Sequence, residues 1–459
     1  MIETIRNAWK LPELRKKILF TVFALLIFRI GSVVPVPYID GEMLSATLSN
    51  IGGIFSLLGT MNGTAFSMAA VFALGVQPYI NSSIIIQLLT VAIPPLERLA
   101  REGGEEGKKK IASITRYVTV VIALLQGFGY YTLIKNYGLL DLGSANGIWA
   151  GIVIVLCFTA GSAFVMWLGE QITEFGIGNG ISIILFAGIL SRVPNAIQTM
   201  VSGVRMWSNQ RNGLVTLESL QAAGYSAEQA QQVLDSAMAP WMIPIIIAAL
   251  LAIVVLIVFI TNSERRIPVQ YAKRVVGRKM YGGQSTHIPM KVNMSGVMPI
   301  IFAQAIASLP ATIGMFFGKS VESEGAWGTF LRVFDTQGVV YIILYFVLIV
   351  GFSYFYSTMQ FNPVEVANNL KKNGGFIPGF RPGKPTVDFI HKVLNKITMF
   401  GALYLAIIAI APIIAGIAIG NNALTIGGTS IIIVVGVALE TTKGMEAQML
   451  MRHYKGFLE

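Results

Sequence analysis

The chain has few charged residues and little metal-binding or nucleophilic chemistry. Only 12% of its 459 residues are Asp, Glu, Lys or Arg, and it holds one cysteine and three histidines. The lone Cys157 excludes an internal disulfide framework and a thiolate metal cluster. No HExxH or Walker A sequence occurs along the chain, so it lacks the motifs of zinc proteases and P-loop ATPases. We therefore expect no catalytic residues, no metal and no cofactor.

Apolar sequence, in contrast, is abundant. Hydrophobic residues make up 54% of the chain, more than a soluble core needs, and this composition is typical of membrane proteins that cross the bilayer many times. A membrane-spanning helix needs about 20 predominantly apolar residues. Ten segments near that length are predicted: 18–36, 68–93, 117–134, 148–168, 179–199, 243–260, 292–317, 338–358, 397–419 and 427–441. The predicted fold class is an all-α polytopic membrane protein with ten transmembrane helices.

The basic residues between these segments are distributed unevenly. Of the 34 Lys and Arg residues, 27 lie in an N-terminal arm, three loops and a tail: 1–17, 94–116, 261–291, 359–396 and 442–459. Cytoplasmic loops carry the excess of Lys and Arg in membrane proteins, so both termini are predicted to be cytoplasmic. Segment 1–17 reads as an amphipathic arm, and 201–240 as an external loop. Arg29, inside the first apolar segment, is either a functional cation or half of a structural pair.

The two longest cytoplasmic loops have a folded character. Loop 261–291 alternates apolar and basic residues in two β-like runs joined near Val276–Gly277. Loop 359–396 is rich in Gly and Pro around Arg381, which indicates a shaped, non-helical loop. Such basic loops serve either membrane orientation alone or the docking of a large acidic or RNA-containing partner.

The two halves of the chain resemble each other. The sequence GVQPYI from Gly75 opens the second apolar segment, and GVMPII from Gly296 opens the seventh. Likewise GNGISII from Gly178 opens the fifth segment, and GGTSIII from Gly427 the tenth. We therefore predict two repeats of five helices, within 18–200 and 241–441. An odd number of spans per repeat inverts the second copy, as in transporters and channels with a central pathway.

The second segment, 68–93, is interrupted by polar residues, Gly75 and Pro78. Broken helices persist in a membrane only beside other protein or a water-filled cavity, so this segment is predicted to line a pathway. The repeated motifs are mainly aliphatic. An aliphatic constriction recognises nothing by hydrogen bonding, but it can fit loosely around a polymer that passes through it. A polypeptide channel is the first hypothesis, and an inverted-repeat secondary transporter of a small solute is the alternative. Glu170 and Glu174 are expected to be solvated or paired charges at the end of a span.

Six long motifs carry a resemblance to a known family: FRIGSVVPVP, FALGVQPYINSSIIIQLL, WLGEQITEFGIGNGISII, QSTHIPMKVNMSGVMPIIFA, FNPVEVANNLKKNGGFIPGFRPG and GGTSIIIVV. In these, and nearly end to end, the chain resembles the SecY family of protein-conducting channels. The resemblance implies a channel that passes unfolded secretory chains and releases apolar helices sideways into lipid. Its second and seventh helices would form a lateral gate, and a short re-entrant plug helix near 54–67 would block the closed channel.

The family's functional positions are carried over residue by residue. The aliphatic pore ring would be Val76, Ile80, Ile181, Leu185, Ile301 and Ile433. The plug would include Ile54, Phe55, Leu58, Met61 and Phe66. Gln87 and Asn293 would be polar residues of the lateral gate. The docking surface for the motor ATPase SecA and the ribosome would include Arg265, Arg266, Lys273, Arg274, Arg278, Lys279 and Arg381.

The resemblance also implies partners and a location. SecE and SecG would be small membrane subunits of the same complex. SecA, the ribosome or the proton motive force would supply the driving force. Signal peptides, unfolded preproteins and membrane lipids would contact the channel. The expected location is the bacterial plasma membrane.

Overall fold

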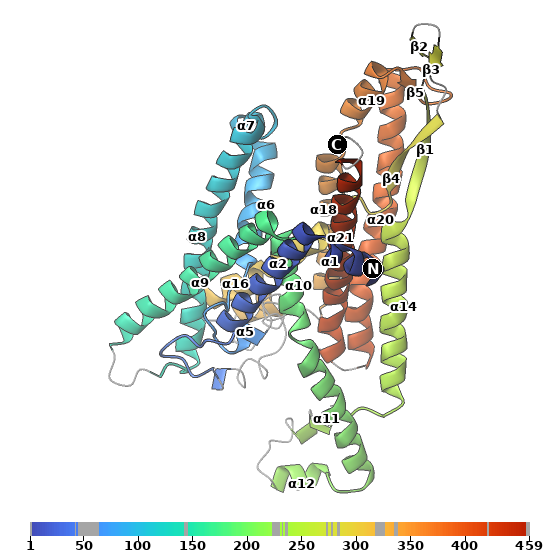
Figure 1. Ribbon diagram of the computed structural model, residues 1–459. Coiled ribbons are helices and arrows are strands. Elements are labelled where there is room, and N and C mark those ends of the chain that lie inside the picture. The colour runs from blue at the N-terminus through green and yellow to red at the C-terminus, as the bar shows by residue number, and fades with distance from the viewer. Residues whose placement is uncertain are drawn as a thin grey trace.

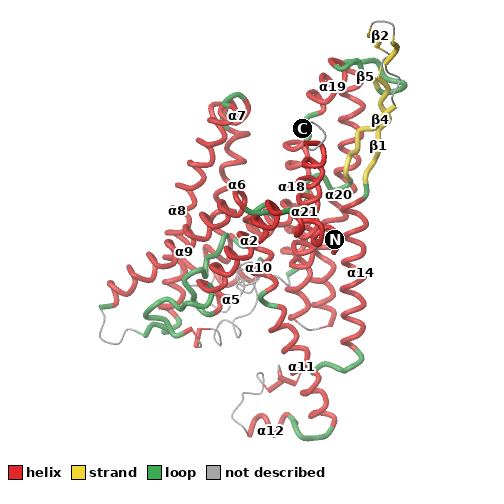
Figure 2. The backbone as a smooth tube through the Cα atoms, viewed as in Figure 1, coloured by secondary structure: helices red, strands yellow, loops and turns green. Residues whose placement is uncertain are grey.

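Helices dominate the structure, as the apolar segments predict. The computed structural model describes residues 2–41, 43–44, 64–141, 146–222, 230–231, 233–234, 237–271, 274–276, 279–281, 285–316, 326–334, 338–419 and 422–455. Within these residues, two groups of packed helices lie side by side, and five short strands rise at one end (Figures 1 and 2).

The first group is built around α9 (Gly147–Phe175), which contacts α2 (Pro12–Gly31), α8 (Gly104–Asn136) and α10 (Gly180–Leu190). The helix α6 (Gln77–Ala92) packs against α8, and α7 (Pro94–Arg101) joins the two at their tip (Figure 1). Pro94 and Pro95 end α6, and the chain bends by 106° into α7, because proline cannot continue the hydrogen-bond ladder of a helix. The short α5 (Thr64–Ser67) precedes this group, while α11 (Val193–Arg211) and α12 (Leu217–Ala222) follow it.

The second group centres on α20 (Lys384–Ile419), which packs between α18 (Val339–Gln360) and α21 (Asn422–Lys455). The helix α14 (Met242–Asn262) lies against α21, and α15 (Met298–Ala307) against α18. Shorter helices complete this half: α16 (Leu309–Phe316), α17 (Ala326–Val333) and α19 (Pro363–Lys372).

The N-terminal arm packs on protein. Its helix α1 (Ile2–Lys10) contacts α2 and α21, and Thr4 donates a 2.9 Å hydrogen bond to Glu446. Ala8 is buried beside Met445 of α21, while Trp9 stays half exposed. Arg29 lies exposed in the last turn of α2, where the negative end of the helix dipole favours a cation.

The strands join the two long basic loops. In loop 261–291, β1 (Glu264–Tyr271) pairs antiparallel with β4 (Ser285–Lys291), and β2 (Arg274–Val276) pairs with β3 (Lys279–Tyr281) at the tip. The predicted pair of β runs is thus confirmed. The other edge of β1 pairs with β5 (Gly375–Phe376) from loop 359–396. Ile267 and Val269 of β1 pack with Leu370 of α19 and Ile390 of α20 in one small core, so the two loops form a single folded unit.

The two groups of helices meet along a seam. The helix α6 packs against α15, α8 against α16, and α10 against α21. One large core of buried side chains crosses this seam and includes residues from both groups. The seam therefore brings together helices that the sequence places in separate repeats.

The helices account for all ten predicted segments. Six described helices are long and apolar enough to cross a membrane, or seven if α6 and α7 count as one bent span. The remaining predicted segments coincide with α2, α15 with α16, and α21. Ten spans are consistent with this arrangement, which is that of a polytopic helical membrane protein.

Many boundaries differ from the prediction: α2, α8 and α20 begin earlier than the predicted segments, and α9 and α21 end later. The second helix begins at Gln77, not near residue 68, because Gly75 adopts a positive φ of 51° and the chain before it forms turns. There Val71 donates a backbone hydrogen bond to Val34, and Ala69 accepts one from Val36. The motif at Gly427 does not open the tenth helix, since α21 already begins at Asn422. Finally α11 extends to Arg211, beyond the predicted end at 199.

Candidate functional site

The six aliphatic residues predicted to form a ring lie in one cluster. Val76, Ile80, Leu185, Ile301 and Ile433 are buried members of the large core, and Ile181 is a partly buried neighbour that packs against it. They come from the start of α6, from α10, from α15 and from α21. The cluster therefore contains residues of both groups of helices, and the side chains of its six residues are all hydrocarbon.

The starts of α6 and α15 have the same backbone construction. Gly75 and Gly296 adopt positive φ values of 51° and 63°, a conformation that glycine reaches without steric cost. Val76 and Val297 follow as N-caps with near-identical dihedral angles, and Pro78 and Pro299 stand in each first turn, where a missing N–H is tolerated. The amides of Ile80 and Ile301 then donate to the carbonyls of Val76 and Val297. This construction brings Ile80 and Ile301 to equivalent places on their helices.

Glycine also lets α10 approach α9 closely. A Cβ at Gly180 would overlap the carbonyl oxygen of Gly169, and one at Gly169 would overlap the side chain of Ile181. Asn179 caps α10 by accepting from the amides of Ile181 and Ser182. These contacts fix the place of Ile181 and Leu185.

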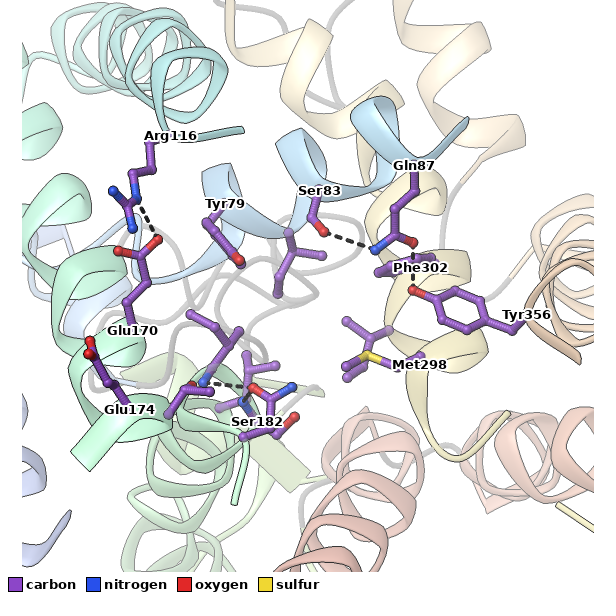
Figure 3. Close-up of a pocket in the computed structure, with 16 residues that line it drawn as sticks. Tyr79, Ser83, Gln87, Arg116, Glu170, Glu174, Ser182, Met298, Phe302 and Tyr356 are labelled. Carbon is purple, nitrogen blue, oxygen red and sulfur yellow. Dashed lines mark hydrogen bonds and ion pairs between the residues drawn. The ribbon is translucent and has the colours of Figure 1, made fainter. Parts of the chain in front are cut away.

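A cavity of about 410 Å³ lies against the aliphatic cluster. Its lining comes from α6, α8, α9, α10, α15, α18 and the turn that precedes α10. The lining residues are Tyr79, Ile80, Ser83, Gln87, Arg116, Glu170, Thr173, Glu174, Asn179, Ile181, Ser182, Leu185, Met298, Ile301, Phe302 and Tyr356 (Figure 3). Four of the six predicted ring residues thus border one space.

An ion pair closes one side of this cavity. The guanidinium of Arg116 on α8 lies 2.8 Å from a carboxylate oxygen of Glu170 on α9. Glu170 is therefore a paired charge, as the sequence predicted. Glu174, one turn further along α9, is exposed and lines the same cavity.

The two polar residues assigned to the lateral gate have different surroundings. Gln87 lines the cavity, donates to Ser83 at 3.3 Å and accepts from the Tyr356 hydroxyl at 2.8 Å. Asn293 is buried in the segment before α15 and accepts from Ser295. Gln87 thus lies on the seam beside α18. No described contact joins Gln87 to Asn293.

Tyr356 was not identified from the sequence. Its partner is 269 residues away, and no local pattern marks a tyrosine in an apolar helix as one side of a seam. The acidic side of the cavity could have been found, because Glu170 and Glu174 are four residues apart and share one face of a helix.

The predicted plug falls mostly outside the described residues. Ile54, Phe55, Leu58 and Met61 belong to the undescribed segment, whereas Phe66 lies in α5. Phe66 is buried, stacks on Tyr130 with ring centroids 4.7 Å apart, and its carbonyl accepts from the Tyr130 hydroxyl. This contact fastens the end of the predicted plug segment to α8.

The predicted docking residues lie on the folded basic loops. Arg265 and Arg266 are exposed on β1, and Arg266 pairs with Glu264 at 2.7 Å. Arg274 and Lys279 belong to β2 and β3, while Lys273 and Arg278 lie outside the described residues. Arg381 is exposed between two glycines of positive φ, Gly379 and Gly383, and its carbonyl accepts from Thr386 at the start of α20. The prediction of a non-helical loop over 359–396 is therefore wrong for most of that range, because α19 and the start of α20 occupy it. Residues 373–383, between these helices, form the shaped turn that leaves Arg381 exposed.

Comparisons with known proteins agree on one family. The model of the SecY family matches residues 70–442. A curated protein translocase subunit SecY of Streptomyces galbus is 41% identical over 471 residues, which cover 100% of both chains. A solved protein-conducting channel covers 97% of both chains with a TM-score of 0.60 and 17% identity. The channel in a canine ribosome–channel complex from the endoplasmic reticulum covers 97% of both chains with a TM-score of 0.56 and 15% identity. These two structures share the fold of the chain.

Proposed function

Because the chain belongs to the SecY family of protein translocase subunits, we propose that it is the channel subunit that passes unfolded secretory polypeptides across a bacterial plasma membrane. It is a multi-pass membrane protein that is not catalytic. The alternative, a secondary transporter of a small solute, is not favoured by these relatives.

One observation carries the proposed mechanism: a cavity at the seam ends on aliphatic side chains from both groups of helices. Hydrocarbon side chains hold no ion and can exclude water when they meet. They also accept any sequence that threads between them, since they offer no hydrogen bonds to be satisfied. The ring would be Val76, Ile80, Ile181, Leu185, Ile301 and Ile433.

The lateral gate would be the seam between α6 and α15. Two hydrogen bonds that join α6 to the second group are Gln77 to Ser308 at 3.3 Å and Tyr356 of α18 to Gln87 at 2.8 Å. The buried core that crosses the seam is apolar, so an apolar helix could replace its contacts when the seam parts. Asn293, at the foot of α15, would belong to the same gate. The plug, from Ile54 to Phe66, would lie beyond the ring.

Several partners complete the proposal. SecE and SecG would pack on the membrane-facing helices. SecA or the ribosome would bind the folded unit of β1, β4, β5 and α19. Three arginines are exposed on this unit: Arg265, Arg266 and Arg381. Both termini and these loops would face the cytoplasm. The distribution of Lys and Arg supports this orientation.

Reconstituted vesicles test the function. We expect vesicles that hold the chain with SecE and SecG to import a preprotein when SecA and ATP are added, measured as protease-protected product. Uptake of small solutes without SecA, combined with no preprotein import in its presence, would support the transporter alternative instead.

A further inference from the structure

The turn that carries Arg381 is anchored on both sides. On the side of β5, Ile377 is 2% exposed and packs in the small core of the folded unit. On the side of α20, the Thr386 hydroxyl donates a 2.8 Å hydrogen bond to the carbonyl of Arg381. Between these anchors, Gly379 and Gly383 adopt positive φ values of 87° and 110°. Because glycine is the most flexible residue in the backbone, this segment needs further contacts to keep one conformation.

One aromatic pair supplies such a contact. The ring of Phe380, next to Arg381, lies against the ring of Phe389 on α20, with centroids 4.2 Å apart and planes inclined by 32°. Phe389 is partly buried against the same small core, whereas Phe380 remains 37% exposed. The Phe380 amide also donates a 3.0 Å hydrogen bond to the Ile377 carbonyl. The pair therefore ties the middle of the turn to the helix that follows it.

The guanidinium of Arg381 has no comparable restraint of its own. It is exposed and forms no ion pair with any described carboxylate. A long side chain loses conformational entropy when it binds a partner, and a backbone already held in the binding conformation reduces that loss. The backbone of the turn sets the direction in which this side chain leaves the protein. A contact that fixes the turn therefore also limits where the guanidinium can point.

We propose that Phe380 is a positioning residue: its ring, held by Phe389, orients Arg381 for the motor ATPase. Guanidinium groups bind carboxylates through two parallel hydrogen bonds, and such pairing depends on direction. Without the phenyl ring, the segment from Gly379 to Gly383 gains conformations, and fewer of them direct the guanidinium at the partner. The inference rests on the proposed function, in which SecA docks at Arg381.

Import by the reconstituted complex tests the proposal through single and double variants. We expect Phe380→Ala to lower the initial rate of SecA-driven import about fivefold, the scale of one aromatic pair, and Phe380→Tyr to keep the normal rate. In an Arg381→Ala chain, Phe380→Ala should cause no further loss, because the ring acts only through the guanidinium. A further fivefold loss in that background would overturn the proposal.

The partner ring separates positioning from direct contact. Phe389→Leu removes the aromatic pair and keeps an apolar side chain against the small core, so its import rate should match that of Phe380→Ala. A normal rate in Phe389→Leu, beside a reduced rate in Phe380→Ala, would show that Phe380 contacts the motor itself. That result would overturn the positioning role.

Phe376 provides the matched control. It is 36% exposed on β5 of the same folded unit and forms no ring contact with a described aromatic residue. Its pairing with Gln270 of β1 uses backbone atoms, which Phe376→Ala keeps. Import by Phe376→Ala should therefore be normal. A loss equal to that in Phe380→Ala would contradict the proposal, because any exposed phenylalanine of the unit would then contribute alike.

The mobility of a spin label tests the geometry without the motor. In a chain with Cys157→Ala, which removes the one native thiol, a nitroxide would be attached at Arg381→Cys in the assembled complex. We expect Phe380→Ala to increase the mobility of the label and Phe376→Ala to leave it unchanged. Equal spectra with and without the Phe380 ring would overturn the proposal. Failure of the unchanged chain to import a preprotein would instead refute the proposed channel function.

Discussion

The hydroxyl of Tyr356 on α18 donates a 2.8 Å hydrogen bond to the side-chain oxygen of Gln87 on α6. At the other end of α6, Gln77 donates to Ser308 at 3.3 Å. Both bonds join a helix of the first group to the second group. Separation of α6 from the second group therefore requires that both bonds break or exchange for others.

Removal of the Tyr356 hydroxyl should ease that separation. Tyr356→Phe removes one hydrogen bond, whose typical net contribution is about 1 kcal/mol. We therefore expect the equilibrium constant for parting the seam to rise about fivefold. Export of a preprotein with a weakened signal sequence should rise by that factor. Tyr354→Phe is the matched control, because its hydroxyl lies at a marginal 3.5 Å from the Asn395 carbonyl at an exposed place. Equal export by the two variants would contradict the role of Tyr356.

A polar side chain in the aliphatic cluster should hydrate the closed channel. Ile301 is only 2% exposed, and a buried amide without a partner costs about 1–3 kcal/mol, which water can relieve by entering. We expect Ile301→Asn to raise ion conductance across planar bilayers and to admit preproteins with defective signals. Ile301→Leu keeps the volume and the apolar character and should leave conductance low. If bilayers that contain the Ile301→Asn variant conduct no ions, the aliphatic cluster is not the seal of the closed channel. Ile433→Asn should act in the same way.

Loss of the Arg381 guanidinium should slow SecA-driven import and leave the fold unchanged. The Arg381 side chain is exposed. The turn is held by a hydrogen bond to the backbone carbonyl of Arg381, and any residue at this position keeps that carbonyl. We expect Arg381→Ala to lower SecA-driven import about tenfold, as the loss of about 1.4 kcal/mol of docking free energy would. Copurification with SecE should persist. Lys372→Ala, at an exposed base of the same loop, should have a smaller effect. Normal import by Arg381→Ala would remove this loop from the docking surface.

The close approach of α9 and α10 should be sensitive to a single methyl group. In Gly180→Ala the new Cβ would overlap the Gly169 carbonyl oxygen, and overpacking of this kind costs about 1–3 kcal/mol. We expect a Tm lowered by at least about 2 °C in detergent. Gly351 of α18 has no heavy atom within 4 Å of an added Cβ, so Gly351→Ala should keep the Tm. A Tm unchanged in both variants would show that α10 can shift away from α9.

Much of the fold could be predicted because its signals are local. Hydropathy identified the segments that became α2, α8, α9, α14, α18 and α20. The GVQP and GVMP motifs identified two helix starts of one construction, since Gly and Pro impose their own dihedral angles. The alternation in loop 261–291 identified β1 and β4. Each of these rests on neighbours within a few residues.

What could not be predicted depends on partners distant in the sequence. Nothing in the sequence near Gly375 indicates that it pairs with Tyr271, or near Gln87 that Tyr356 will donate to it. The similarity of Gly427 to Gly178 suggested a helix start. The chain there already follows the helical path from Asn422, because a glycine is tolerated inside an apolar helix when its neighbours continue the ladder. The unequal charge of the cavity walls likewise emerges only when α8 meets α9.

The pairing of β5 with β1 has a mechanical consequence. Because β1 follows α14 almost directly and β5 precedes α20 by a short turn, a load on the strand hairpin is divided between two helices. Both helices adjoin α21, which contributes Ile433 to the aliphatic cluster. A force applied to the hairpin would therefore reach α21 through both α14 and α20.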